Sequence, residues 1–337
     1  MFSCISQYFS YYYNYYFKLN IPSILQEAHS YSKLTQNNQI APLDITDSYK
    51  QVFSTNNSSI NIKLLFYQMY SNNDNVPTFI NPENSKIFKY QNKLFKINSK
   101  KNYNNYINII NIILNNNLKN IITPEEIYSN QNKNYEYIEI FPYYSDGDLF
   151  TYVENTDLTF IEINNIYTQI VNIIYDLHTK QIAHRDIKLE NFLIQFENNQ
   201  LIIKITDLDF CCIATTDLNF KGGTIQYASY ELMNFKTVNN WYSSDIWSLT
   251  VILHILLFNT FPWSNSYNSI NTNKSCIIFN DYLSKKPYEY WNLQLITKYN
   301  KNDKYFNLYN YLLTYGFNIN WKEREDINYI KYLLTQV

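Results

Sequence analysis

The sequence predicts an α+β protein with two lobes, a small β-rich one followed by a larger helical one. Between about Ile60 and Tyr144, apolar residues fall in short runs with the length of β-strands. After Tyr144 they recur mainly at the spacing of amphipathic helices. With 337 residues, 46% of them hydrophobic, the chain is long enough to bury a core in both lobes.

The predicted elements follow this division in chain order. Residues 1–50 show no lasting period and are expected to form an irregular extension, which leaves 51–337 for the folded domain. We assign 51–141 to the small lobe and 145–337 to the large lobe. Strands are expected at Ile62–Tyr67, Lys86–Tyr90, Lys93–Ile97, Ile127–Tyr128 and Tyr135–Phe141, with one helix at Tyr103–Leu118. In the large lobe we expect helices at Leu149–Val153, Ile161–His178 and Trp247–Leu257, and a hairpin of Phe192–Gln195 with Leu201–Ile205.

Composition narrows the function and the compartment. The net charge of −2 and the pI near 6.1 argue against a nucleic-acid partner or an acidic membrane surface. The four cysteines are either isolated or adjacent, as at Cys211 and Cys212, so we expect neither a disulfide framework nor a zinc site. A reducing compartment fits best, with the cytoplasm favoured and the nucleus as the alternative.

Two features of the composition bear on structure. The chain has 35 Tyr but only 4 Gly, and Asn tolerates positive φ better than other residues, so Asn is expected at turn positions that Gly would usually occupy. The start of the chain lacks the basic and apolar regions of a signal peptide. The segment Ile246–Trp263 is apolar but interrupted by polar residues, which predicts a buried core helix and no membrane span.

The strongest chemical signal is the run His184–Asn191, which reads HRDIKLEN and precedes a hairpin and a strand that ends in Asp207. Phosphoryl transfer needs a carboxylate that orients the accepting hydroxyl and takes its proton, and Asp186 can supply it. Lys188 can reach the γ-phosphate and offset charge in the transition state. Asn191 and Asp207 carry the hard oxygen ligands that Mg²⁺ prefers, and the hairpin would bring them together.

With these motifs in place, the sequence resembles the eukaryotic protein kinase family from about Ile60 onward. The other motifs that carry the resemblance fall in the family's order: GDLF at Gly147–Phe150, LHTKQIAHRD at Leu177–Asp186, GTIQYASYE at Gly223–Glu231, SDIWSLTVIL at Ser244–Leu253 and FPW at Phe261–Trp263. The resemblance implies a bilobal protein kinase fold, with ATP and Mg²⁺ as cofactors. GDLF, the DIWSL helix and the NTFPW turn are, more narrowly, similar to fungal Ran-type kinases of nutrient and meiotic signalling.

The resemblance also implies structural or regulatory roles for a set of residues in the large lobe: His184, Arg185, Thr224, Glu231, Asp245 and Arg324. Asp245 would hold the backbone of the catalytic loop, and Glu231 would pair internally with Arg324. Arg185 would be able to meet a phosphate placed on Thr215 or its neighbour in the activation segment. Both threonines are equally compatible with a plain loop.

The magnesium motif departs from the family's D-F-G, because it reads Asp207-Leu208-Asp209. Leu208 keeps an apolar side chain, whereas Asp209 replaces the permissive glycine. An alternative register takes Asp209-Phe210-Cys211 as the motif, but it breaks the K-x-T-D match, so Asp207 is preferred.

The small lobe departs further. KLFKI at Lys93–Ile97 resembles the family's V-A-I-K strand, which makes Lys96 the candidate ligand of the α- and β-phosphates, with a solvated strand residue as the alternative. The family's glutamate partner should lie on the next helix, where the count reaches Ile109 and no acidic residue occurs. No glycine precedes Gly147, so the phosphate-covering loop would fall on Ser71–Phe79 without its usual glycines.

The adenine-binding hinge is placed by counting back from GDLF. Phe141 falls at the gatekeeper position. Pro142 would offer its C=O to adenine, and Tyr144 would offer its N–H. Asp148 would face the ribose or a basic residue of the substrate.

These patterns predict a Mg-ATP-dependent protein kinase that acts on Ser or Thr hydroxyls of protein substrates, because Lys188 is typical of Ser/Thr kinases. The alternative is a pseudokinase, a binding or scaffold module with weakened ATP binding. A small-molecule phosphotransferase is less favoured, since Gly223–Glu231 resembles a platform for protein substrates.

Overall fold

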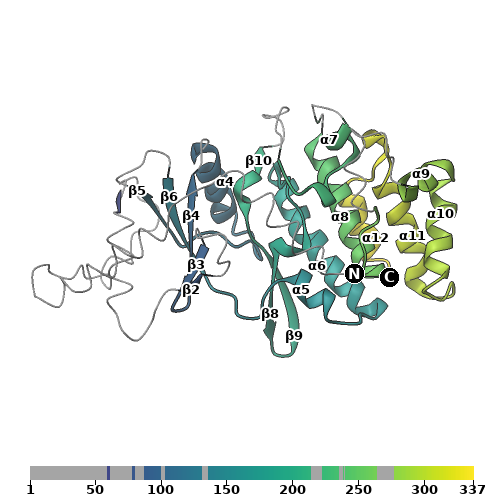
Figure 1. Cartoon of the computed structure of the whole chain (residues 1–337), viewed down its shortest axis with the longest axis horizontal. Coiled ribbons are helices and arrows are strands. Elements are labelled where there is room, and N and C mark those ends of the chain that lie inside the picture. The colour runs from purple at the N-terminus through teal and green to yellow at the C-terminus, as the bar shows by residue number, and fades with distance from the viewer. Residues whose placement is uncertain are drawn as a thin grey trace, which may run out of the picture. The chain divides into compact units, whose positions relative to one another are not determined.

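The computed structural model describes residues 59–60, 78–79, 87–99, 103–130, 136–213, 222–234, 238, 240–263 and 277–337. Two compact units make up the chain, one of Met1–Tyr103 with Thr123–Tyr143 and one of Asn104–Ile122 with Tyr144–Val337. A unit of strands and a mainly helical unit agree with the α+β kinase fold predicted from the sequence (Figure 1). The expected extension at 1–50 lies outside the described residues.

The described part of the first unit is built on one sheet with the strand order β1-β5-β6-β4-β3-β2. Its strands are β1 (Ser59–Ile60), β2 (Thr78–Phe79), β3 (Ile87–Tyr90), β4 (Lys93–Ser99), β5 (Glu126–Asn130) and β6 (Glu136–Pro142). β1 pairs with β5 in parallel and the other pairs are antiparallel. Four of the five predicted small-lobe strands are confirmed as β3 to β6, and the one expected at Ile62–Tyr67 lies outside the described residues.

Alternation along the strands gives this sheet two different faces. One face forms an apolar cluster of Phe88, Phe95, Ile97, Ile138 and Ile140. The rings of Phe88 and Phe95 stack within it, with centroids 5.0 Å apart. On the opposite face, Lys96 of β4 stands directly across from Glu139 of β6.

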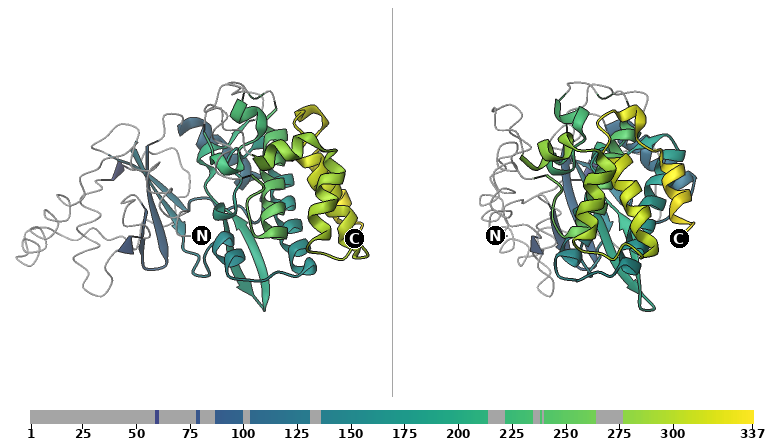
Figure 2. Two further views of the ribbon diagram at one scale, coloured as in Figure 1. Left: turned by 45° about the vertical axis from the view of Figure 1, so that its right-hand side comes forward. Right: turned by 90° about the vertical axis from the view of Figure 1, so that its right-hand side faces the viewer.

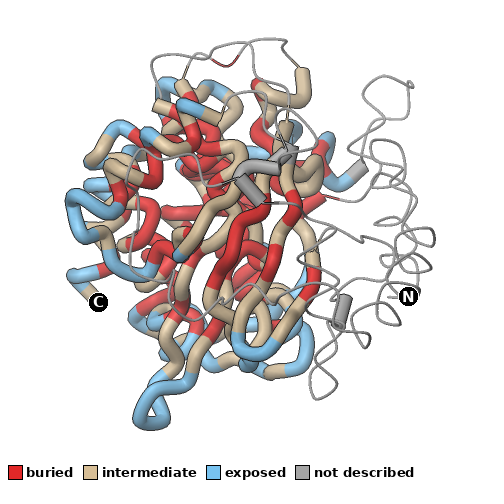
Figure 3. Tube along the Cα trace, turned by 90° about the vertical axis from the view of Figure 1, so that its left-hand side faces the viewer, coloured by how far each residue is buried: buried red, intermediate tan, exposed pale blue. Residues whose placement is uncertain are grey.

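Helices dominate the second unit. Besides most of α4 (Tyr103–Asn115), its described helices are α5 (Leu149–Glu154), α6 (Phe160–Thr179), α7 (Tyr230–Asn234), α8 (Trp241–Phe258), α9 (Ile277–Ser284), α10 (Pro287–Ile296), α11 (Lys304–Gly316) and α12 (Ile327–Leu334). α8 packs against α6 and α11, and α12 packs on α6 (Figure 2). Buried residues run through the helices and strands of the unit, whereas exposed ones lie in connecting turns and on the outer faces of helices such as α9 and α10 (Figure 3).

The helix α4 (Tyr103–Asn115) was expected within the small lobe, yet from Asn104 onward it belongs to the second unit. Local contacts explain this grouping. The Asn105 side chain donates to the carbonyl of Cys211, with a nitrogen-to-oxygen distance of 3.5 Å. After the helix, backbone hydrogen bonds tie Asn120 and Ile122 to Ile205. The apolar face of α4 is buried at Tyr106, Ile109, Ile110 and Ile113.

α8 is the central helix of the second unit. It is long and apolar enough by length and composition to cross a membrane, and it alone passes that test among the described residues. The helix is 83% buried inside the protein, which is the behaviour of a core helix. Asn240 caps its start by accepting from the Ser243 N–H, and Asn259 ends it with a left-handed φ of 54°.

Asparagine occupies positive-φ positions, as the scarcity of glycine predicts. The hairpin of β8 (Phe192–Glu197) and β9 (Gln200–Ile205) turns through Asn198 and Asn199, whose φ angles are 48° and 62°. Two positive φ angles in a two-residue loop define a type I′ turn, whose twist matches that of the strands. Asn117, Asn120 and Asn259 take the same conformation elsewhere.

The contact between α11 and α8 depends on a glycine. A Cβ placed on Gly316 would lie 2.0 Å from the Thr250 Oγ1 and 2.8 Å from its Cγ2. Thr250 is itself fixed, because its hydroxyl donates to the carbonyl of Ile246 at 2.8 Å. The two helices can therefore approach this closely only because residue 316 has no side chain.

Replacing Gly316 by alanine should lower the free energy of unfolding by about 1–3 kcal/mol through overpacking, measured by denaturant unfolding. Thr250→Ala removes the two nearest clashing groups, so the double variant should lose less stability than the sum of the single losses. A Gly316→Ala variant as stable as the parent would contradict the close packing.

Candidate active site

Two pairs of short strands bring the predicted catalytic residues together in the second unit. β7 (Ile182–Ala183) pairs with β10 (Cys212–Ile213) on either side of the loop and the hairpin. The β8–β9 hairpin closes the interval between them, and the Thr206 N–H donates to the Asn191 carbonyl at 2.9 Å. Asp207 is the residue after Thr206, so this hydrogen bond brings it close to Asn191. Sixteen positions separate Asp207 from Asn191 in the sequence.

Asp186 is the buried centre of a polar network. Its Oδ1 accepts from both the N–H and the hydroxyl of Thr224, each at 2.8 Å. Its Oδ2 lies 2.9 Å from the Lys188 Nζ, and the same ammonium donates to the Thr224 hydroxyl at 2.9 Å. The three side chains therefore form a closed triangle, in which each one contacts the other two.

Electrostatic interactions keep Asp186 and Lys188, the two charged members of this triangle, ionised at neutral pH. Burial alone would raise the pKa of Asp186, but the charge of Lys188 and the hydrogen bonds from Lys188 and Thr224 outweigh it and lower the pKa. Burial likewise opposes the charge of Lys188, yet the neighbouring Asp186 raises the pKa of that lysine. A carboxylate held in this way is a weak base in the resting protein and a precise acceptor for a hydroxyl.

Asn191 is oriented by the same loop. Its Nδ2 donates to the Asp186 carbonyl at 2.8 Å and approaches the Asp186 Oδ2 at 3.3 Å. The amide oxygen, on the other side of the group, is the atom that a hard cation takes. An amide oxygen and the carboxylate of Asp207 suit Mg²⁺, which keeps further waters or phosphate oxygens in its shell. The described residues contain no cluster of three or more His, Cys, Asp or Glu that could hold a metal.

Asp207 occupies a left-handed conformation, with φ 62° and ψ 67°, at the start of the 3-10 helix η2 (Leu208–Phe210). Leu208 is buried, as expected for the apolar residue of the magnesium motif. Asp209 lies within η2 and not at the end of β9. The preference for Asp207 over the alternative register that begins at Asp209 stays a prediction.

The side chain of Asp245, on α8, accepts hydrogen bonds from the backbone of the predicted catalytic loop. Its Oδ2 accepts the His184 N–H at 2.8 Å and its Oδ1 accepts the Arg185 N–H at 2.9 Å. His178, near the end of α6, places its Nε2 2.9 Å from the same carboxylate. One buried aspartate thus connects two helices to the backbone of the loop.

The loop needs this support because its backbone is strained. Arg185 has a φ of 68°, a conformation that costs a non-glycine residue free energy. Gly223 packs directly against it, and a Cβ on Gly223 would lie 2.7 Å from the Arg185 carbonyl oxygen. With its own φ of 91°, residue 223 must be glycine for Thr224 to reach Asp186.

Arg185 and His184 are both engaged inside the protein. The Arg185 Nε donates to the Phe210 carbonyl, and its guanidinium lies 5.1 Å from the centroid of the Trp241 ring. The His184 Nδ1 faces the Asp186 N–H at 3.3 Å. Burial lowers the pKa of His184 and so favours its neutral form. Thr215 and Thr216, the two expected phosphate sites for Arg185, lie outside the described residues.

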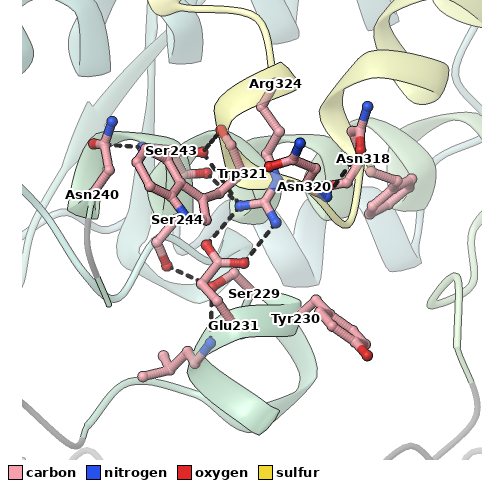
Figure 4. A network of polar contacts seen from close by, with 12 residues as sticks. Ser229, Tyr230, Glu231, Asn240, Ser243, Ser244, Asn318, Asn320, Trp321 and Arg324 are labelled. Carbon is pink, nitrogen blue, oxygen red and sulfur yellow. Dashed lines mark hydrogen bonds and ion pairs between the residues drawn. The ribbon is translucent and has the colours of Figure 1, made fainter. Parts of the chain in front are cut away.

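Glu231 and Arg324 form a bidentate ion pair at the edge of the site (Figure 4). The nitrogen-to-oxygen distances are 2.7 and 2.6 Å, and both side chains are buried. Arg324 also donates to the carbonyls of Ser243 and Asn318, at 3.0 and 2.8 Å. The guanidinium therefore ties α7, α8 and the segment before α12 together.

A model of the protein kinase domain matches residues 76–324, which is most of the chain. The chain belongs to the protein kinase family. It is 32% identical over 158 residues to the human NUAK family SNF1-like kinase 2, covering 44% of this chain and 23% of that protein. The same kinase of the rat is 34% identical over 151 residues, with 42% and 22% covered. The probable serine/threonine-protein kinase nek1 of Dictyostelium discoideum is 30% identical over 163 residues, with 42% and 33% covered. The aligned stretch spans a third or less of each of these relatives.

Two residues that are expected to contact nucleotide, Asp148 and Tyr144, also have side-chain contacts within the protein. Asp148 caps α5, because its two carboxylate oxygens accept from the N–H and the hydroxyl of Thr151 at 2.8 and 3.0 Å. The expected contact of Asp148 with ribose or a basic residue of the substrate stays a prediction. The ring of Tyr144 lies 5.1 Å from the Lys204 Nζ.

The remaining predicted nucleotide ligands belong to the first unit. Lys96 lies in the middle of β4. Phe141, which is buried, stands across from Leu94 near the end of β6, and Pro142 closes that strand opposite Lys93.

Sequence reasoning missed two residues that the site depends on. His178 looks like an ordinary residue at the end of a helix, and only the fold shows that it reaches Asp245. Gly223 lay within a quoted motif, but its packing against Arg185 was not foreseen. The rarity of glycine was the available signal, because a chain with only 4 Gly is expected to keep glycine where no other residue fits.

Replacing Arg324 by methionine should lower the free energy of unfolding by about 3–5 kcal/mol, because the buried Glu231 carboxylate loses its charge partner. Adding Glu231→Gln should restore part of the loss, which denaturant unfolding would measure. Lys286→Met serves as the matched control, since it breaks only the exposed pair with Glu289 and should leave the midpoint unchanged. Equal effects of Arg324→Met and Lys286→Met would contradict the importance of the buried pair.

Proposed function

We propose that this kinase domain is an active protein Ser/Thr kinase that transfers the γ-phosphate of ATP to hydroxyl groups of protein substrates and uses Mg²⁺. The observation that carries the proposal is the closed triangle of Asp186, Lys188 and Thr224. Burying an ion pair is costly unless every partner is in place. A domain used only for binding would have no need to keep an arrangement that orients a hydroxyl.

The chemistry follows from the positions of these side chains. Asp186 orients the accepting hydroxyl and takes its proton as the oxygen attacks the γ-phosphorus of ATP, while the bond to the β–γ bridging oxygen breaks and ADP leaves. Lys188 offsets the negative charge that develops on the transferred group. Asn191 and Asp207 would hold Mg²⁺, which when bound neutralises the phosphates and keeps them in line.

The preference for Ser or Thr rests on Lys188 and on the names of relatives. The Dictyostelium relative carries the name of a serine/threonine-protein kinase. The GTIQYASYE segment that contains Thr224 supplies the platform for a protein substrate, and Glu231 of that segment is anchored by Arg324. We place the protein in the cytoplasm, with the nucleus as the alternative.

The pseudokinase remains the second candidate because specific residues favour it. Asp209 stands where the magnesium motif has glycine, and no glycine precedes Gly147. α4 carries no carboxylate, and Ile109 is fully buried at the position expected for one. These departures weaken the grip on nucleotide more than they affect the orientation of the hydroxyl.

Mg-ATP should raise the melting temperature of the parent protein by a small but measurable amount, since a ligand stabilises in proportion to RT ln(1 + [L]/Kd). Thermal melts with ATP in Mg²⁺ and with ATP in EDTA would measure it. Asp207→Asn, which removes one charged ligand, should abolish the difference between the two conditions. An equal shift with EDTA would exclude a metal role for Asp207.

Asp186→Asn should lower turnover about 10²-fold or more, as expected for a positioned base, while folding and nucleotide binding change little. A phosphate-transfer assay on a generic Ser/Thr protein substrate, beside a thermal melt, would test both parts. No turnover in the parent protein, together with normal folding, would favour the pseudokinase. Equal turnover in variant and parent would assign the activity to a contaminant.

A further inference from the structure

Lys96, the lysine expected to bind the phosphates of ATP, lies across from a carboxylate in the same sheet. Lys96 and Glu139 are direct partners in the antiparallel pairing of β4 with β6. Residues paired in this way point to the same face, with Cβ atoms about 4.5–5.5 Å apart. The other cross-strand neighbours of the two side chains are apolar, Ile87 beside Lys96 and Ile127 beside Glu139.

Burial makes an isolated Glu139 untenable. The residue is 0% exposed, whereas Lys96 is only partly buried. A carboxylate removed from water needs a charge partner and hydrogen bonds. Asn98, the next residue of β4 on the same face, supplies one hydrogen bond, from its Nδ2 to the Glu139 Oε2 at 3.3 Å. The cation nearest in register is Lys96.

We propose that Glu139 is the charge partner of Lys96 and positions its ammonium for the phosphates of ATP. In this domain a strand carboxylate would take the place of the missing helix carboxylate. The positioning role rests on the proposed function, whereas the pairing itself does not. Glu139 acts through Lys96 and is a positioning residue, not a ligand of the nucleotide.

Tyr103 is the alternative partner of Glu139. Its ring stacks on Tyr137, with centroids 3.7 Å apart, and Tyr137 lies two residues before Glu139 on β6. Burial and then the nearby Tyr137 and Glu139 raise the pKa of Tyr103. The phenol is therefore neutral and can offer Glu139 a hydrogen bond, but it cannot supply the opposite charge that a buried carboxylate needs.

The location of the pair has a consequence for regulation. Both residues lie in one sheet of the first unit, so the pair forms whatever the second unit does. In a typical protein kinase, the lysine–glutamate pair forms only when a mobile helix is in place. Here the lysine is oriented permanently, and control of activity must act elsewhere.

A double-mutant cycle on the full chain tests the pairing without nucleotide. Lys96→Met leaves the buried carboxylate without its cation and should lower the melting temperature by about 5 °C or more. Glu139→Gln removes the charge and should cost less. The double variant should melt at a higher temperature than Lys96→Met alone, because the second change removes the uncompensated charge.

Two control cycles sharpen the result. Lys93→Met, which breaks the exposed pair with Glu125, should combine additively with Glu139→Gln. Tyr103→Phe should also be nearly additive with it. Additive losses for Lys96→Met and Glu139→Gln would overturn the proposal. Strong coupling of Glu139→Gln with Tyr103→Phe alone would overturn it too and would assign the carboxylate to the phenol.

Measuring the affinities for ATP and for adenosine distinguishes a loss of Lys96 positioning from a general disturbance of the binding site. Glu139→Gln should weaken ATP about 10-fold, the loss of one charge-assisted contact, and leave adenosine unchanged, because Lys96 meets only phosphate. Adding Glu139→Gln to Lys96→Met should cause no further loss of ATP affinity. Equal weakening of both ligands would overturn the positioning role. A parent that binds ATP no better than adenosine would refute the proposed function, while the thermal cycle would still decide the pairing.

Discussion

The arrangement of the candidate active site depends on one buried carboxylate that never needs to touch substrate. Asp245 accepts from two successive backbone N–H groups of the catalytic loop and contacts His178 of a second helix. The loop has a strained backbone at Arg185, which would relax without these contacts. Relaxation would move Asp186, and the contacts of Asp186 with Lys188 and Thr224 would be lost together.

The chain contains only 4 Gly, and other residues occupy positions where glycine would be usual. Asparagine takes left-handed positions at Asn198 and Asn259, where it tolerates positive φ better than most residues. Thr250 stands where the family's S-D-x-W-S-L-G-V motif has glycine, and the facing residue Gly316 provides the missing space. A glycine lost on one helix is thus matched by a glycine on its neighbour. Gly223 cannot be exchanged in this way, because it combines positive φ with a close backbone contact.

Short-range patterns predicted most of the architecture. The catalytic loop, the hairpin and strands β3 to β6 follow from alternation and spacing within a few residues, so the sequence alone places them. The capping role of Asp148 and the unit to which α4 belongs were not foreseen. The same holds for Glu139, which looks like one more charged strand residue until the register places it across from Lys96. Each depends on which segment lies next to it in space, and a single sequence does not encode that visibly.

The ion pair of Glu231 with Arg324 also orders events during synthesis. The two residues are 93 positions apart, so Glu231 emerges from the ribosome long before its partner exists. Until then the segment around α7 carries an uncompensated acidic group at a place that must become buried, and it cannot settle there. Nascent chains fold from the N-terminal end as they emerge. The segment around α7 is therefore among the last parts of the domain to be completed, because Glu231 is paired only after Arg324 has left the ribosome.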